Sequence, residues 1–209
     1  MNTKDLIFHT AKRLFYNNGF HDTTARALAK ACGIVHSNLF YHYDSMNDIA
    51  LQIMQEFVET SRKIVLECED DLTPIELYIS YTIVDIYYMY YDRKFAELCF
   101  EIPEILSDAI YDNAVKEIFP ELNLASGSED KQRIYAYLDL QAVITTQIKT
   151  TSLVKNRNLN LNINQVIEYI LQLKKRIWNI DDKTFNHARQ RSEQIVRAVD
   201  YSKLNIFIQ

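Results

Sequence analysis

Glycine and proline are scarce in this chain, and their scarcity limits what it can fold into. The 209 residues contain three glycines and three prolines, and two of the glycines, Gly19 and Gly33, lie within the first 33 positions. Because both residue types interrupt helices and mark turns, their rarity after Gly33 favours long, uninterrupted helices. Apolar residues make up 48% of the chain, which is enough for a sizeable core. We therefore expect an all-α fold.

Two short helices joined by a glycine turn are predicted between Thr23 and Tyr43. The first, from Ala25 to Cys32, is rich in alanine, so a second helix can approach its axis closely and at a steep angle. Gly33 tolerates the positive φ that often ends a helix. Ile34 and Leu39 then turn the second helix back onto the first. This arrangement is a helix-turn-helix, and it leaves the outer face of the second helix free.

The free face of the second helix carries short or planar hydrogen-bonding side chains, namely His36, Ser37, Asn38, Tyr41 and His42. Side chains of this kind read base edges and phosphates when a helix enters the major groove of DNA. An ordinary helical hairpin with a polar, solvated side would show the same pattern. The pattern alone therefore leaves both interpretations open.

Pairs of residues at fixed spacings run through this segment: Gly19-Phe20, Thr23-Thr24, Leu28-Ala29, Gly33-Ile34 and the run from Leu39 to Tyr43. Over about 45 residues the spacing resembles the DNA-binding domain of TetR-family transcriptional regulators. The resemblance implies a homodimer that binds a near-palindromic operator in double-stranded DNA, most simply a repressor released by a small-molecule effector. On this basis the expected DNA-binding residues are Thr23, Thr24, Arg26, His36, Ser37, Asn38, Tyr41 and His42.

Several positions depart from the family pattern. Val35 stands where the second helix is usually capped by Ser or Thr, and it cannot accept a backbone hydrogen bond. Ala27 replaces the usual acidic residue, so Thr24 must cap the first helix alone. Met46 stands where many members carry a phosphate-binding lysine, and Asp44 precedes it, so we expect fewer phosphate contacts. These departures keep an alternative open, a helical small-molecule-binding protein that has lost operator recognition.

The formal net charge of −5 is unevenly distributed along the chain. Residues 1–48 hold five Lys and Arg against four acidic residues, and the remaining 161 residues hold 18 against 24, so the two parts carry +1 and −6. Bulk electrostatic attraction to DNA is therefore weak. We expect affinity to depend on two copies and on good geometry.

The chain is predicted to form two domains, a DNA-binding domain at 1–48 and an effector-binding and dimerisation domain at 49–209. A helix from about Thr3 to Asn17, with Thr3 as its cap, completes the first domain. A helix from Ser45 to about Glu67 contains no Gly or Pro, so we expect a rigid connector between the domains. The apolar tail from Leu204 to Ile208 is expected to dock on the rest of the chain.

A tyrosine-rich helix should follow the start signal Thr73-Pro74-Ile75-Glu76. Six tyrosines between Tyr78 and Tyr91 are more than a dry core needs, because a buried hydroxyl requires a partner. A partly wet helix interface and an aromatic ligand pocket both explain them. A carboxylate among the rings would favour a cationic or hydrogen-bond-donating apolar ligand. The expected pocket residues are Tyr81, Asp85, Tyr88, Tyr91, Phe95 and Phe100.

Further helices are predicted at 104–119, 128–154, 164–179 and 184–199. The resemblance implies that the last long helices pair across a two-fold axis, but their Leu and Ile content equally permits packing within one chain. The sequence shows no metal-binding motif, nucleophile elbow or phosphate loop. We therefore expect no catalytic residues, no metal and no cofactor. With neither a signal peptide nor a long apolar run, a cytoplasmic protein without membrane contact is expected.

Overall fold

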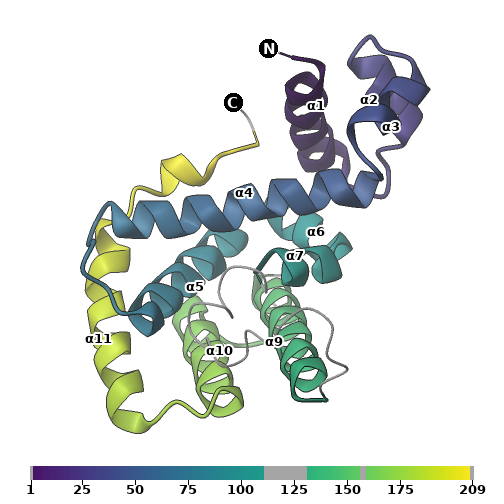
Figure 1. Cartoon of the computed structure of the whole chain (residues 1–209). Coiled ribbons are helices and arrows are strands. Elements are labelled where there is room, and N and C mark those ends of the chain that lie inside the picture. The colour runs from purple at the N-terminus through teal and green to yellow at the C-terminus, as the bar shows by residue number, and fades with distance from the viewer. Residues whose placement is uncertain (1, 111–130, 156–158, 208–209) are drawn as a thin grey trace.

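In the computed structural model, residues 2–110, 131–155 and 159–207 are described, and every regular element within these ranges is a helix (Figure 1). This confirms the all-α prediction. The predicted loop at 124–130, and parts of the helices predicted at 104–119 and 128–154, lie outside the described residues. The observed elements are α1 (Thr3–Asn18), α2 (Ala25–Ala31), α3 (His36–His42), α4 (Met46–Leu66), α5 (Pro74–Tyr91), α6 (Arg93–Glu101), α7 (Pro103–Ile110), α9 (Lys131–Lys155), α10 (Ile163–Ile177), α11 (Asp182–Ala198) and the short 3-10 helix η3 (Tyr201–Leu204).

Helices α1, α2 and α3 form the N-terminal domain around a small apolar core. Ile7, Leu28 and Leu39 are fully buried in it, one from each helix. The start of α1 differs from the prediction, because Asn2 and not Thr3 is the N-cap and forms a reciprocal capping box with Asp5. An amide oxygen one residue earlier reaches the free backbone N–H groups just as a threonine hydroxyl would.

Helix α4 connects the N-terminal domain to the remaining helices, the C-terminal domain, and runs along its edge (Figure 1). The hydroxyl of Ser45 caps it by accepting from the backbone N–H of Asp48 at 3.0 Å. Apolar residues recur along one side of the helix and are buried from Ile49 to Val65. The helix passes from one domain to the other without interruption, as predicted.

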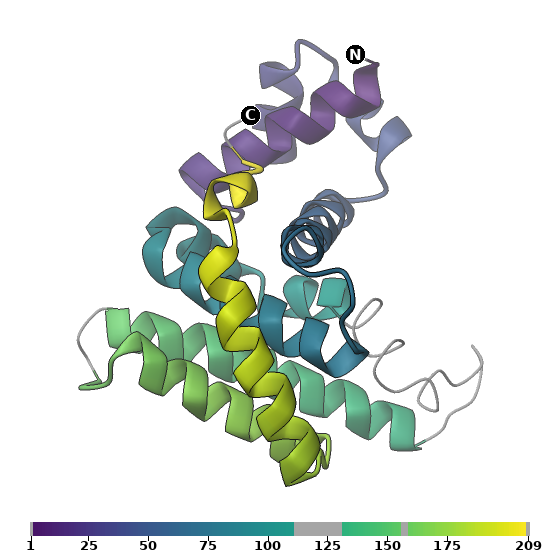
Figure 2. The same ribbon diagram turned by 90° about the vertical axis from the view of Figure 1, so that its left-hand side faces the viewer.

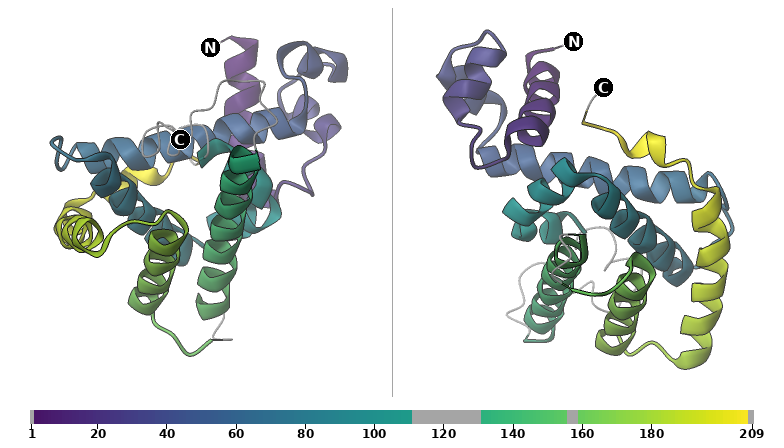
Figure 3. Two further views of the ribbon diagram at one scale, coloured as in Figure 1. Left: turned by 60° about the horizontal axis from the view of Figure 1, so that its bottom comes forward. Right: turned by 180° about the vertical axis from the view of Figure 1, so that it is seen from behind.

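Helix α5 is the central helix of the C-terminal domain. Thr73 and Glu76 form the predicted capping box, with Pro74 in the first turn. Because α5 is apolar almost all round, it can pack against α4, α9, α10 and α11 at once. Helices α9 and α10 pack side by side at the far side of the domain (Figure 3). The following helix, α11, crosses α5, and the chain then returns towards α1 (Figure 2).

Candidate DNA-binding surface and ligand cavity

The turn between α2 and α3 sets the orientation of α3. Gly33 has φ +68° and ends α2. Its backbone N–H donates to the carbonyl of Lys30 at 3.1 Å, and the N–H of Ile34 donates to that of Ala29 at 3.0 Å. This pair of bonds is a Schellman motif, which satisfies two carbonyls at the helix end. Residues 33–35 are thereby held in one tight turn, and α3 packs on α2 through the buried Leu39.

The exposed side of α3 brings most of the predicted DNA-binding residues together. His36, Ser37 and Tyr41 are exposed, with Tyr41 at 83%, while Asn38 and His42 are half-buried. The ring of Tyr41 lies edge-on to that of His42, with centroids 5.1 Å apart. This surface, which we call the α3 face, presents hydroxyl, amide and imidazole groups to solvent.

The predicted residues at the start of α2 divide into two groups. Thr24 and Arg26 are exposed, and the Thr24 hydroxyl accepts from the N–H of Ala27 at 3.1 Å, so it caps α2 without a capping box. Thr23 is buried, and its hydroxyl donates to the carbonyl of Gly19 at 2.7 Å. The structure therefore places Thr23 inside the turn after α1, apart from the α3 face.

The missing cap predicted for α3 is observed, and one cation of the N-terminal domain is already paired. Val35 occupies the N-cap position of α3, where an aliphatic side chain cannot accept a backbone N–H. Lys12, one of the five cations counted towards DNA binding, is buried and paired with Glu56 of α4 at 2.8 Å. That lysine fastens the N-terminal domain to the connector helix, and its charge is already compensated.

The six predicted ligand-binding residues do not share one cavity. Tyr81, Asp85, Tyr88 and Phe95 are buried in the core between helices. Tyr91 is 74% exposed and Phe100 is 56% exposed. Helical periodicity places residues on faces, but it does not show which face another helix covers. Tyr81, Asp85 and Phe95 therefore lie within helix interfaces, whereas Tyr88 and Tyr91 line a cavity of about 760 Å³ beside the start of α6.

Asp85 belongs to a buried polar centre that also contains Lys174 of α10. The Lys174 ammonium donates to the hydroxyl of Thr82 at 3.0 Å and lies 4.6 Å from the ring centroid of Tyr78. Burial raises the pKa of Asp85 to about 7, although the nearby Ser61 hydroxyl and Lys174 act against the rise. Burial likewise lowers the pKa of Lys174 to about 7. An internal cation thus already faces the carboxylate that was expected to attract a cationic ligand.

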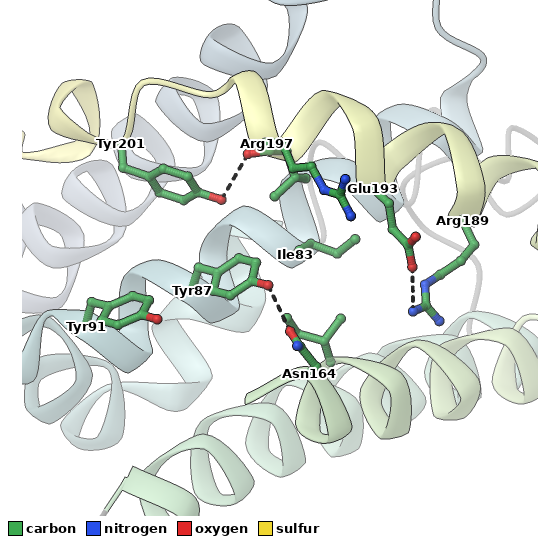
Figure 4. A pocket seen from close by; sticks show the side chains of 10 residues that line it. Ile83, Tyr87, Tyr91, Asn164, Arg189, Glu193, Arg197 and Tyr201 are labelled. Carbon is green, nitrogen blue, oxygen red and sulfur yellow. Dashed lines mark hydrogen bonds and ion pairs between the residues drawn. The ribbon is translucent and has the colours of Figure 1, made fainter. Parts of the chain in front are cut away.

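A cavity of about 620 Å³ lies on another side of α5, between that helix, α10, α11 and η3 (Figure 4). We call it the α5–α11 cavity. Of the six predicted ligand residues, Tyr91 alone is among those that line it. Tyr87, Arg197 and Tyr201 also line it, and sequence reasoning did not select them. The tyrosine density of α5 signalled an aromatic site, but Arg197 and Tyr201 are more than 100 residues away in the sequence.

Three contacts join the N-terminal domain to α6 and the chain end. Tyr16 of α1 donates its hydroxyl to Asp92 at 2.7 Å. The Glu101 carboxylate accepts from the backbone N–H groups of Phe20 and His21 at 2.6 and 3.0 Å. Phe207 is buried and stacks on the ring of Tyr16, with centroids 5.2 Å apart. The apolar tail therefore docks at the junction of the two domains.

Among the described residues there is no group of three or more His, Cys, Asp or Glu side chains placed to hold a metal ion. Within the same ranges, no helix has both the length and the apolar character needed to span a membrane.

The comparisons with known sequences cover part of the chain. The family model described as bacterial regulatory proteins, tetR family, matches residues 7–53. The HTH-type transcriptional regulator QacR of Staphylococcus aureus is 29% identical over 92 residues, which are 42% of this chain and 49% of QacR. The match therefore spans about half the length of that relative.

The solved structures that resemble this chain are far less similar to it in sequence. RolR in complex with its ligand resorcinol is 10% identical, with a TM-score of 0.50 over 80% of this chain and 92% of RolR. The multidrug binding protein EbrR complexed with imidazole is 13% identical, with a TM-score of 0.47 over 83% of this chain and 95% of EbrR. The match at residues 7–53 and the helix-turn-helix observed there show that the N-terminal domain is similar to the DNA-binding domain of bacterial regulatory proteins of the tetR family.

Proposed function

We propose that this protein is a ligand-responsive transcriptional regulator that binds a near-palindromic operator as a homodimer and is released from it by a small, mostly apolar or aromatic effector. The α3 face is the observation that carries the proposal. It places an amide, a hydroxyl and an exposed tyrosine on one side of a helix that a Schellman turn holds in position. Ser37 and Asn38 are placed to read base edges, and Tyr41 to contact the phosphate backbone.

The proposal of a homodimer is supported by apolar residues on the outer side of the α9 and α10 pair. Leu138 and Leu153 of α9 are 54% and 40% exposed, and Tyr169 of α10 is 47% exposed. The same helices bury Val143, Ile148, Ile167 and Ile170 inside the chain. Exposed apolar side chains on neighbouring helices favour an interaction surface, and a second copy of the chain would cover them.

The test begins by selecting operator DNA from a random duplex library and measuring its affinity by fluorescence anisotropy at fixed salt. Asn38→Ala should relax the preference at one base pair of each half-site by about 1–3 kcal/mol. Tyr41→Phe should instead weaken binding to all sequences alike. Asn186→Ala removes the same type of side chain from an exposed position of α11, far from the N-terminal domain, and should leave both properties unchanged.

Failure to select any sequence from the library would contradict the proposed function. It would favour the alternative of a helical small-molecule-binding protein that has lost operator recognition. Two features support that alternative, the uncapped start of α3 at Val35 and the acidic Asp44 just after α3. If operator DNA is selected but Asn38→Ala leaves its base preference unaltered, the assignment of the α3 face is wrong.

A further inference from the structure

The α5–α11 cavity has the size and the partial enclosure of a small-molecule site. Its volume of about 620 Å³ falls within the range of roughly 300–1,000 Å³ that is usual for ligand pockets. Four separate elements form its walls, and two of them, α11 and η3, come from the last part of the chain. Figure 4 shows side chains from α5, α10, α11 and η3 converging on it.

Aromatic rings form one end of the cavity. The rings of Tyr87 and Tyr91 are nearly parallel, with centroids 6.4 Å apart, and Tyr201 stands edge-on to Tyr87 at 6.2 Å. The hydroxyls of two of these tyrosines are held in place, because Tyr87 donates to the side chain of Asn164 at 3.0 Å and Tyr201 to the carbonyl of Val196 at 3.5 Å. The ring faces and edges are therefore fixed, and they suit a flat apolar or aromatic group.

The charges at the other end of the cavity are not equally available to a ligand. Arg189 pairs with the carboxylates of both Glu168 and Glu193. Two carboxylates therefore already balance the charge of Arg189, although its buried Nε has no hydrogen-bond partner among the described residues. Arg197 also lines the cavity, and within the described ranges its guanidinium has no hydrogen bond or ion pair. A guanidinium without a partner beside an aromatic wall is complementary to a carboxylate.

We propose that the α5–α11 cavity binds a small aromatic carboxylate, with its ring against Tyr87, Tyr91 and Tyr201 and its carboxylate on Arg197. This inference differs from the cationic ligand that the tyrosines and Asp85 suggested, because Asp85 faces the internal cation Lys174 while Arg197 faces the cavity. It rests on the proposed function only in identifying this ligand with the effector. Binding itself requires no DNA.

The proposal is tested first by calorimetric titration of the full chain with benzoate, benzyl alcohol and benzylamine. Benzoate should bind with a dissociation constant of about 1 mM or tighter. Benzyl alcohol and benzylamine should each bind at least about tenfold more weakly, because one has no charge and the other carries the charge of Arg197 itself.

The second experiment compares two variants that each remove one positive charge from α11. Arg197→Gln should weaken benzoate binding at least about tenfold, whereas Lys183→Gln, at the exposed start of α11, should leave it within about twofold. Arg197→Lys keeps the charge but not the planar fork, so it should bind benzoate more tightly than Arg197→Gln. Far-ultraviolet circular dichroism establishes that each variant is folded.

The inference is overturned if the unmodified chain shows no saturable binding of benzoate, if benzyl alcohol binds equally well, or if Arg197→Gln binds benzoate as the unmodified chain does. The selection of operator DNA is a separate measurement. If operator DNA is bound but benzoate is not, the cavity assignment is wrong and the proposed function stands. If benzoate binds as expected but the library yields no operator, the cavity assignment stands and the proposed function is wrong.

Discussion

Glu101 makes a direct polar contact between the two domains. It is the last residue of α6, and its carboxylate accepts two backbone N–H groups from the turn that follows α1. The Glu101 carboxylate also crowds position 19, where an added Cβ on Gly19 would lie 2.7 Å from one of the Glu101 oxygens. Gly19 also has φ +91°, a conformation that favours glycine. The close approach of Glu101 and the backbone shape therefore depend on the same small residue.

Replacing Glu101 should loosen this contact without creating a cavity in a core. We expect Glu101→Ala to lower the free energy of unfolding by about 1–3 kcal/mol, because hydrogen bonds to a charged acceptor are among the stronger ones. Glu101→Gln keeps an acceptor but no charge and should lose less. Urea denaturation provides the measurement, with Glu97→Gln, an exposed partner of Arg93, as the control. Equal stability of Glu101→Ala and the unmodified chain would show that the contact contributes nothing.

The buried pair of Asp85 and Lys174 predicts an unusual dependence of stability on pH. The folded-state pKa of Asp85 is raised to about 7. The contribution of this carboxyl to the free energy of unfolding is therefore fully present below the ordinary pKa of an aspartate and is lost as the pH rises towards 7. The folded-state pKa of Lys174 is lowered to about 7, so its stability is full above its ordinary pKa and is lost as the pH falls towards 7. The contribution of the pair should therefore be smallest near neutral pH.

Variants at these two positions test whether Asp85 and Lys174 determine the pH dependence of stability. Lys174→Met alone leaves a buried carboxyl without its cation and should cost about 3–5 kcal/mol at pH 8. Adding Asp85→Asn should recover part of that loss and flatten the dependence of the unfolding free energy on pH between 5 and 9. The check is a series of urea denaturation curves across that range. An unchanged pH profile in the double variant would mean that other groups determine it.

At the scale of elements, the C-terminal segment after α11 packs between the two domains. Leu204 and Phe207 are buried, and Phe207 contacts Tyr16 of α1 on one side and Phe95 of α6 on the other. Lys203 pairs with Glu67 just beyond α4 at 2.6 Å. Tyr201, in the same segment, lines the α5–α11 cavity. One short stretch of chain therefore contacts the α5–α11 cavity, the end of α4 and the N-terminal domain.

Removing the ring of Phe207 should weaken the junction of the two domains. We expect Phe207→Ala to cost about 3–5 kcal/mol of unfolding free energy, the usual loss for truncating a buried phenylalanine. Phe100→Ala removes the same ring from a half-exposed position and should change stability by no more than about 0.5 kcal/mol. Hydrogen exchange of α1 should rise in the first variant and not in the second. Similar effects of the two substitutions would show that the tail does not stabilise the junction.

At the scale of the whole molecule, the proposed operator binding would use two N-terminal domains with fixed spacing. A weakly basic domain, in which Lys12 is already paired with Glu56, gains affinity from being presented twice. Two-fold symmetry would also match a near-palindromic site. The proposed surface for the second copy is the apolar outer side of α9 and α10.

Charged substitutions on that surface should produce monomers. Leu153→Glu combined with Tyr169→Glu should shift the mass measured by light scattering from dimer to monomer, because two unpaired charges would be buried in an apolar contact. Operator affinity should fall at least about tenfold, since each monomer would bind a half-site alone. Leu66→Glu, at the partly exposed end of α4, should alter neither. A dimer that persists in the double variant would move the interface elsewhere.

Local features of this protein could be read from the sequence because their causes lie within a few residues. Gly33 ends α2, Thr73 with Glu76 starts α5, and Val35 leaves α3 without a side-chain cap, as predicted. The start of α1 was misplaced by one residue because Asn2 and Thr3 can both cap a helix. Propensity, capping and periodicity act over about one or two helical turns, so such errors remain small.

The site depended on the tertiary structure. Periodicity placed Tyr81, Asp85 and Tyr88 on α5, but only the packing of α4, α9 and α10 decided that they are buried and that Asp85 faces Lys174. The α5–α11 cavity joins residues 83 and 201, whose proximity no local pattern encodes. A helix has the same sequence whether its neighbour covers one face or another. Long-range packing therefore decides which aromatic residues form the core and which line the cavity.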